Sequence, residues 1–243
     1  MHSTTMVTYT GKIFLLLGIA STKAVFAYSG HKPTKPSFNR RAFLLSTIAI
    51  PSLSTATASP SLAFENRLDD QYLDRTPQIG RQPDYLGAKT RTSTTLGKEY
   101  EGLAPCDGRP NCWCSSTPKQ DNPARYIDPW DPNGSSKGIQ DLKKVVDSYQ
   151  VGQQGIDGGG FQVLEYDEKA RYLYVQFQSY KNGYIDDAEF WFNPEKNQFD
   201  VRSASRLGQS DLGVNAKRLE YIGGRLEKEF GWKLKRRKSG SLV

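Results

Sequence analysis

Residues 185–215 read I-D-D-A-E-F-W-F-N-P-E-K-N-Q-F-D-V-R-S-A-S-R-L-G-Q-S-D-L-G-V-N. Apolar and polar residues alternate on both sides of a loop at residues 193–198, and this period of two predicts two strands joined as a hairpin. If Phe192 faces Phe199 across the loop, the apolar residues of both strands share one side of the hairpin. The pattern therefore predicts an antiparallel pair with one face against a core.

The other side of this hairpin carries charge. The same register sets Glu189 opposite Arg202 and brings Asp187 near Arg206, one step further along. A slip of one residue would turn these charged side chains toward the core, so the pattern specifies the register. We therefore expect one apolar flank and one ionic flank.

The preceding segment predicts a third strand. Asn182 and Gly183 form a dipeptide that favours a two-residue hairpin turn with positive φ. Closing that turn pairs three apolar residues with the apolar side of the first hairpin: Phe177 with Ala188, Val175 with Phe190, and Leu173 with Phe192. Both turns then place apolar residues on one common face.

Two amphipathic helices are expected to cover this face. The first begins at Ser135 or Ser136 and ends before Gly152, and the second is capped by Asp211 or Asn215. The second helix has one apolar stripe, formed by Leu219, Ile222, Leu226 and Phe230.

Four strands complete the pattern, near residues 161–166, 171–180, 185–192 and 199–206. Short turns join them into an antiparallel meander. The predicted fold class is α+β, a two-layer domain with a four-stranded antiparallel meander sheet and two helices packed on one face. The glycines at 158–160 are interpreted as a flexible link, and those at 223–224 predict close packing of the last helix on the sheet.

The first 63 residues have the composition of targeting sequence. Residues 1–27 contain a short apolar run typical of a signal peptide. Residues 28–63 join an acid-free, transit-like segment to Arg40-Arg41 and a second short apolar run, which resembles a twin-arginine signal. In series, these signals predict a route through plastid membranes into the thylakoid lumen, with no transmembrane helix in the mature chain.

The net charge of +7 comes largely from this leader. Six of the 33 lysines and arginines lie in residues 1–63, which hold no acid, so 27 basic residues meet 26 acidic ones in the rest. A nucleic-acid surface needs clustered cations, and such a run stands only in the basic tail, residues 233–243. We expect a solvated tail and no nucleic-acid partner.

Few catalytic schemes fit the mature chain. Both histidines, His2 and His31, lie in the leader, which leaves no histidine for a serine–histidine triad, a zinc site or a haem ligand. Asp187 and Glu189 remain as an acid–base pair with Arg202 as an anion-binding group. Because a directly opposed Glu and Arg more often neutralise each other, we expect no catalytic residue, no metal and no cofactor.

Three cysteines, Cys106, Cys112 and Cys114, fall in a loop that contains Gly and Pro. Disulfides persist in the lumen, so we predict a Cys106–Cys112 bridge, with Cys114 free or exchanging with it. A zinc site would lack a fourth ligand, and a redox dithiol usually has C-x-x-C before a helix. A structural bridge is therefore favoured, and a regulatory disulfide is the alternative.

A family resemblance rests on three runs: V-R-S-A-S-R-L-G-Q-S-D-L-G-V-N-A-K-R at 201–218, D-D-A-E-F at 186–190, and C-D-G-R-P-N-C-W-C-S-S at 106–116. Together they resemble the family called domain of unknown function 1499, in the family's order, over residues 102–230. The resemblance implies a small secreted or organellar domain, placed here at residues 102–232, without an established activity or cofactor. The chain departs from the family at Cys114, where relatives usually have another residue.

Residues 64–101, called the arm below, are polar and show no strand or helix period over a long window. They predict an extended segment that is either a disordered leader or a strap along a partner, with disorder the favoured interpretation.

The sheet face opposite the helices is expected to be open. It displays Trp191, Tyr172, Tyr174, Gln176, Asp187, Glu189, Arg202 and Arg206. Trp, Tyr and Arg are favoured in protein interfaces, so this composition predicts a docking surface. The alternative is an ordinary solvated sheet face with weak salt bridges.

This face and the targeting signals predict that the chain is a non-enzymatic protein of the thylakoid lumen. It would dock to a thylakoid membrane protein complex and help to assemble or stabilise it. The alternative is a soluble carrier, in which a curved sheet holds a lipid, a pigment or another small apolar ligand.

Overall fold

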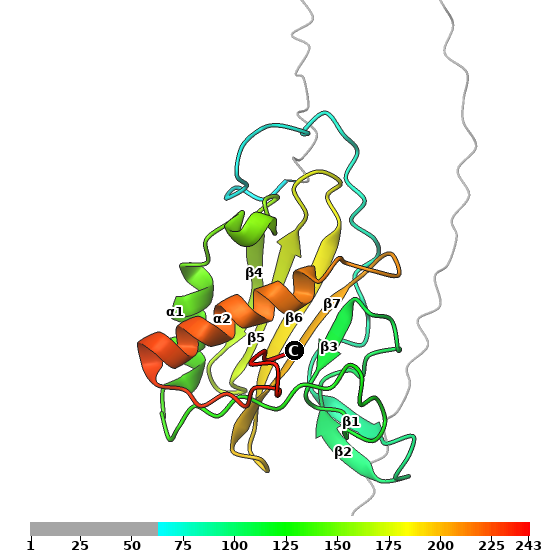
Figure 1. Cartoon of the computed structure of the whole chain (residues 1–243), viewed down its shortest axis with the longest axis vertical. Coiled ribbons are helices and arrows are strands. Elements are labelled where there is room, and N and C mark those ends of the chain that lie inside the picture. Colours follow the sequence, from blue (N-terminus) through cyan, green and yellow to red (C-terminus); the bar gives the residue numbers. More distant parts are fainter. Residues whose placement is uncertain (1–62) are drawn as a thin grey trace, which may run out of the picture. The chain divides into compact units, whose positions relative to one another are not determined.

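A five-stranded antiparallel sheet forms the centre of the part of the chain that the computed structural model describes, residues 63–243 (Figure 1). The strands lie in the order β3-β7-β6-β5-β4 across the sheet. Their bounds are Cys112–Cys114 for β3, Phe161–Asp167 for β4, Tyr172–Gln178 for β5, Ile185–Asn193 for β6 and Gln198–Ser205 for β7. Residues 1–62 lie outside the described residues. They hold the predicted signal peptide, residues 1–27, and all but the last residue of the predicted transit and twin-arginine segment, residues 28–63.

The predicted α+β class with antiparallel pairing and two helices is confirmed, but the sheet has five strands instead of four. The additional strand, β3, lies at the edge and pairs Cys112 with Ala204 and Cys114 with Arg202. Three residues are too few to show a period of two, so the sequence pattern missed it. A separate two-stranded sheet joins β1 (Lys89–Thr92) to β2 (Glu99–Gly102).

The register of the β6–β7 hairpin agrees with the prediction. Phe192 lies opposite Phe199, and Glu189 lies opposite Arg202. The polarity pattern alone specified this pairing, because a slip of one residue would have exchanged the two faces.

The predicted register between β5 and β6 was wrong by two residues. Val175 pairs with Ala188 instead of Phe190, and Leu173 pairs with Phe190 instead of Phe192. The connection is a loop of residues 179–184, not a two-residue turn at Asn-Gly. A shift of two keeps every side chain on its own face, so the predicted apolar face is correct despite the error.

The arm explains why this loop is longer than the Asn-Gly signal predicts. The backbone N–H of Gln78 donates to the carbonyl of Asn182 at 2.8 Å, and Pro77 lies against Gly183. Within the loop, the N–H of Ser179 donates to the carbonyl of Tyr184 at 2.9 Å. The contacts of Pro77 and Gln78 come from outside the hairpin, so the local sequence of the loop does not indicate them.

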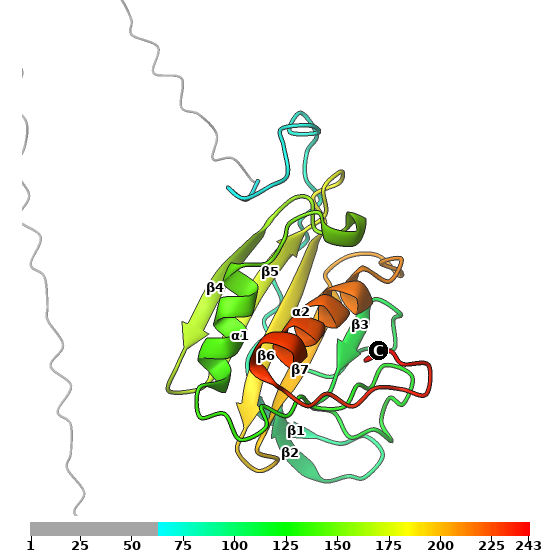
Figure 2. The ribbon, with the colours of Figure 1, turned by 60° about the vertical axis from the view of Figure 1, so that its left-hand side comes forward.

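Helices α1 (Gly138–Asp147) and α2 (Val214–Phe230) lie side by side on one face of the sheet (Figure 2). Helix α1 begins at Gly138, two or three residues after the predicted start at Ser135 or Ser136. The hydroxyl of Ser135 donates to Asp141 in the first turn at 3.0 Å. The N-cap of α2 is Gly213, not the predicted Asp211 or Asn215, although the carboxylate of Asp211 accepts hydrogen bonds from the backbone N–H groups of Gly213 and Asn215. A single turn of 3-10 helix, η1 (Gln153–Gly155), follows α1.

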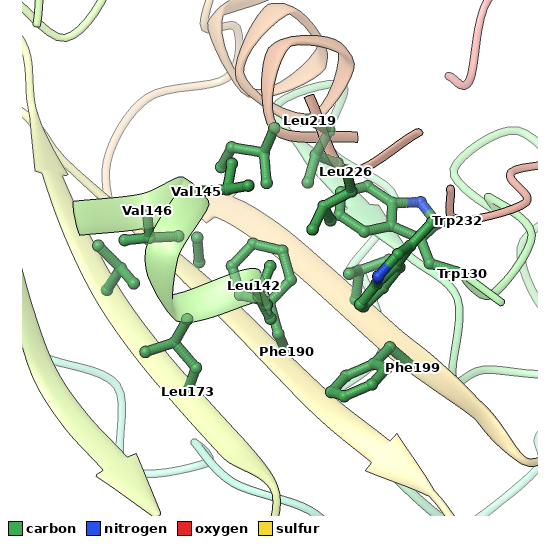
Figure 3. Close-up of a cluster of buried hydrophobic side chains, with 14 of the residues drawn as sticks. Trp130, Leu142, Val145, Val146, Leu173, Phe190, Phe199, Leu219, Leu226 and Trp232 are labelled. Carbon is green, nitrogen blue, oxygen red and sulfur yellow. The ribbon is translucent and has the colours of Figure 1, made fainter. Parts of the chain in front are cut away.

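The core lies between the two helices and the sheet (Figure 3). Leu142, Val145 and Leu219 from the helices meet Leu173 and Phe190 from the sheet, and all five side chains are fully buried. The apolar face predicted from the two hairpins is therefore the face that the helices cover.

An arginine lies inside this core with every N–H in use. Arg218 of α2 is fully buried, and its Nε and one Nη bind the two carboxylate oxygens of Asp157 at 2.9 and 2.5 Å. The same Nη donates to Asp186 of β6 at 2.7 Å, while the other donates to Ser203 at 3.1 Å and to Asn215 at 2.8 Å. This buried cluster joins α2, two strands and the segment before β4.

Three further expectations are corrected by packing. The glycines at 158–160 are not a flexible link. The N–H of Gly159 donates to the carbonyl of Gln178 in β5, the N–H of Gln178 donates to Gly160, and a Cβ at Gly159 would meet two carbonyl oxygens at 2.8 Å. Gly223 packs against the C-terminal residues Leu234 and Leu242, not on the sheet. The basic tail is not fully solvated, since those two leucines are buried and Arg236 pairs with acids of α2.

The predicted Cys106–Cys112 disulfide is present, and Cys114 is a free, buried thiol. These cysteines form a small buried cluster with Ala204 of β7. The bridge therefore closes the loop that leads into the edge strand β3.

Replacing Arg218 with Met should lower the free energy of unfolding by about 3–5 kcal/mol, because Asp157 and Asp186 would remain buried without their cation. Urea unfolding followed by circular dichroism measures the change. The matched control is Arg236→Met: this arginine also pairs with two carboxylates but is 36% exposed, and its loss should cost less than about 1 kcal/mol. Equal losses in the two variants would contradict a structural role for the buried cluster.

Candidate binding site between the arm and the sheet

The outer face of the sheet, opposite the helices, is covered by the arm. Leu86, Ala88 and Leu103, from the arm and the residues just after it, pack against a cluster formed by Tyr172, Tyr174 and Trp191. The backbone N–H of Gly87 donates to Glu189 at 2.7 Å and fixes the arm to β6. The expectation of an open face and a disordered leader is therefore corrected.

All eight residues predicted on this face come together there, but their side chains are buried instead of displayed. Trp191 is 7% exposed and Glu189 is fully buried. Two hydrogen-bonded networks, one around Glu189 and one around Asp187, hold seven of these side chains, and Trp191 packs in the apolar cluster.

Glu189 gathers donors from three directions. One carboxylate oxygen accepts the hydroxyl of Tyr172 at 2.9 Å and the N–H of Gly87 at 2.7 Å. The other accepts from Arg202 at a long 3.4 Å. Arg202 also donates to the hydroxyl of Tyr85 at 3.2 Å, and its guanidinium carbon lies 5.0 Å from the centre of that ring. The arm thus completes the environment of an ion pair that belongs to the sheet.

Asp187 forms the second network with better geometry. Arg206 binds both of its oxygens, at 2.9 and 2.8 Å, and Tyr174 donates its hydroxyl at 2.6 Å. Gln176 donates to the Tyr174 hydroxyl at 2.7 Å. The bidentate pair predicted from the register is therefore present and closed by a tyrosine.

The two tyrosines are held as hydrogen-bond donors. Burial, together with the charge of Glu189 that accepts its proton, raises the pKa of Tyr172 well above its ordinary value. Burial and the charge of Asp187 raise the pKa of Tyr174 in the same direction. Both phenols therefore remain protonated and donate to a carboxylate at physiological pH.

A cavity of about 500 Å³ lies where the arm crosses this face. We call it the aromatic cavity. Its walls are residues 82, 83 and 86–88 of the arm, Glu101 of β2, Glu165 of β4, Ala170, and the three aromatic side chains Tyr172, Tyr174 and Trp191. Within the described residues its lining contains two carboxylates and no lysine or arginine. An electronegative, partly aromatic cavity of this size accommodates a small molecule.

This geometry is suited to binding. Asp187 and Glu189 are each occupied by a guanidinium and a phenol, so in this arrangement neither carboxylate faces the cavity as a free base. Cys114 is a poor nucleophile, because burial raises the pKa of its thiol and lowers the thiolate fraction. Residues 63–243 contain no group of three side chains placed to hold a metal ion. Over the same residues, no helix combines the length and apolar character needed to cross a bilayer.

Sequence reasoning missed the arm residues that close the site. Tyr85, Leu86, Gly87 and Ala88 are a short run of aromatic, apolar and small residues inside an otherwise polar segment. That run was the available signal, but four residues are too few to show a period.

Comparison with known proteins identifies one family. The model described as "Protein of unknown function (DUF1499)" matches residues 102–226, just over half of the chain. The match covers the five-stranded sheet, α1 and α2 as far as Leu226, and it begins directly after the arm. Neither the curated proteins nor the solved structures contain a match to this chain.

Tyr172 should make stability fall with rising pH above about 10. In the unfolded chain this phenol ionises near 10.0, whereas the folded protein retains the proton, so unfolding releases a proton and becomes easier. Each such group contributes a slope of about 1.4 kcal/mol per pH unit between its two pKa values. Tyr172→Phe should therefore flatten the decline by about that amount.

Urea unfolding of both proteins between pH 9 and pH 11.5 tests this slope. The control is Tyr184→Phe, at a loop position 37% exposed, which should leave the slope unchanged. Identical slopes for wild type and Tyr172→Phe would show that burial and the hydrogen bond to Glu189 do not keep the Tyr172 phenol protonated in the folded protein.

Proposed function

Since the chain belongs to the DUF1499 family of proteins of unknown function, we propose from the geometry of its own site that it is a non-catalytic module that binds a small organic cation in the aromatic cavity. The observation that carries this proposal is the lining of that cavity, with Trp191, Tyr172 and Tyr174 beside two carboxylates and no cationic side chain. Aromatic faces and carboxylates together attract a positively charged nitrogen that carries apolar substituents.

The polar part of the lining decides against a lipid chain. Glu101 and Glu165 stand on the wall, and the side chain of Gln82 joins them from the arm. A long apolar ligand would desolvate these groups without giving them a partner, which is unfavourable. A cation satisfies them, so we place a charged ligand ahead of the apolar ligand expected from the sequence.

Docking of a thylakoid membrane complex through Trp191 ranks second. It would require the arm to leave the sheet, which breaks the hydrogen bond from Gly87 to Glu189 and uncovers the cluster around Tyr172. Ligand entry into the aromatic cavity needs no such change. An assembly role at a photosynthetic complex is therefore proposed only for a state in which the arm has moved.

We further propose that this binding takes place in the thylakoid lumen. The supporting pattern is the series of signals in residues 1–63, and a Cys106–Cys112 disulfide suits an oxidising compartment. Import of a tagged chain into isolated plastids, followed by fractionation, tests the location. Recovery from the stroma or the envelope would contradict it.

Choline and its neutral isostere 3,3-dimethylbutan-1-ol distinguish a cation site from an apolar one. Calorimetry on the purified chain should show choline binding more tightly by about tenfold, because only choline has the cation–π and carboxylate attractions. Equal affinity for the two probes, or no binding of choline, would contradict the proposal.

A cavity-filling variant locates the binding. Ala170 is exposed at the rim of the cavity, so Ala170→Trp should obstruct it without disturbing the core and should weaken choline binding by about tenfold or more. Ala124→Trp is the matched control, because Ala124 is also exposed and lines neither the aromatic cavity nor any other cavity described here. Unchanged affinity in Ala170→Trp would place the ligand elsewhere.

A further inference from the structure

A second cavity, of about 280 Å³, lies on the same outer face beside the edge strand β3. We call it the arginine cavity. Three arginines line it, Arg91 of β1, Arg109 of the disulfide loop and Arg202 of β7, together with Tyr85 and Asp107. Its lining therefore has the opposite charge to that of the aromatic cavity.

Arg202 has a donor that the protein leaves unused. Its side chain is 3% exposed, and its Nε has no hydrogen-bond partner among the described residues. Its bond to Glu189 is long, at 3.4 Å. Arg218 of α2, which is fully buried, uses all five of its N–H groups. A buried guanidinium with an unsatisfied N–H is unfavourable unless a ligand completes it.

The other two arginines are held in position without full neutralisation. Arg91 donates to the backbone carbonyls of Gly102, Tyr85 and Gly87 at 2.8, 3.0 and 3.2 Å. These contacts fix the guanidinium but leave its positive charge. Arg109 pairs with Asp107 at 2.7 Å, the one carboxylate in the lining. Arg202 also pairs with Glu189 outside the lining, so three cations face two anions and the site keeps a net positive charge.

We propose that the arginine cavity binds a small oxyanion, either a carboxylate or a phosphate. Guanidinium groups recognise the planar or tetrahedral oxygens of these anions through paired hydrogen bonds. The Tyr85 hydroxyl adds a neutral polar group on the arm side of the cavity. This site is separate from the aromatic cavity and does not depend on the cation proposed there.

Two substitutions of opposite sign test the site in the purified chain. Arg109→Gln removes a cation from the lining and should weaken anion binding by about tenfold. Asp107→Asn removes the competing carboxylate and should tighten binding by about threefold. Both residues lie in an exposed loop, so circular dichroism and thermal unfolding should confirm that each variant folds.

The probes are inorganic phosphate and succinate, titrated by calorimetry at constant ionic strength against sodium chloride. The matched control is Arg225→Gln, an arginine of α2 in a partly exposed pair with Glu229 at 2.6 Å, which should leave binding unchanged. Tighter binding of one probe identifies the class of anion. Absence of binding by both probes, or equal affinities in wild type, Arg109→Gln and Asp107→Asn, would overturn the proposal.

Discussion

The ion cluster at Arg218 is the constraint on which the layers of this domain depend. A guanidinium in the core has no water to satisfy it, so its five N–H groups need acceptors at fixed positions. Asp157 from the segment before β4, Asp186 from β6 and Asn215 from α2 itself supply most of them. These acceptors therefore fix the position of α2 on the sheet, and apolar side chains pack around the cluster to form the core.

Strand β6 has a buried ion pair on each face of the sheet. Asp186 and Asp187 are adjacent, so their side chains point to opposite sides of the sheet. Asp186 meets Arg218 under the helices, and Asp187 meets Arg206 under the arm. Every residue of β6 is buried, although its sequence alternates between apolar and charged side chains. The central strand thus connects two buried ionic networks, and the register of the sheet aligns both.

The burial of both faces of β6 explains which features of the sheet the sequence predicts and which it does not. Alternation reveals which residues share a face, so the pairing of Glu189 with Arg202 and the apolar face of β5 are predictable. It does not reveal whether the polar face meets water or a covering segment. The cover here is the arm, whose short run around Gly87 shows no period. The residues that share this face were therefore predicted correctly, while their exposure was not. Arg218 was missed because its partners are distant in sequence.

The arm also unites the two proposed ligand sites. Tyr85 lines the arginine cavity, and Gly87, two residues later, lines the aromatic cavity, so one short segment is a wall of both. Its position depends on Glu189, which accepts from the Gly87 backbone while its other oxygen faces Arg202. An anion that drew Arg202 toward the arginine cavity would leave more of the Glu189 charge for its remaining donors, Gly87 and Tyr172. The two proposed sites are thus connected through a single buried carboxylate, Glu189, which pairs with Arg202 and accepts the hydrogen bond that holds the arm.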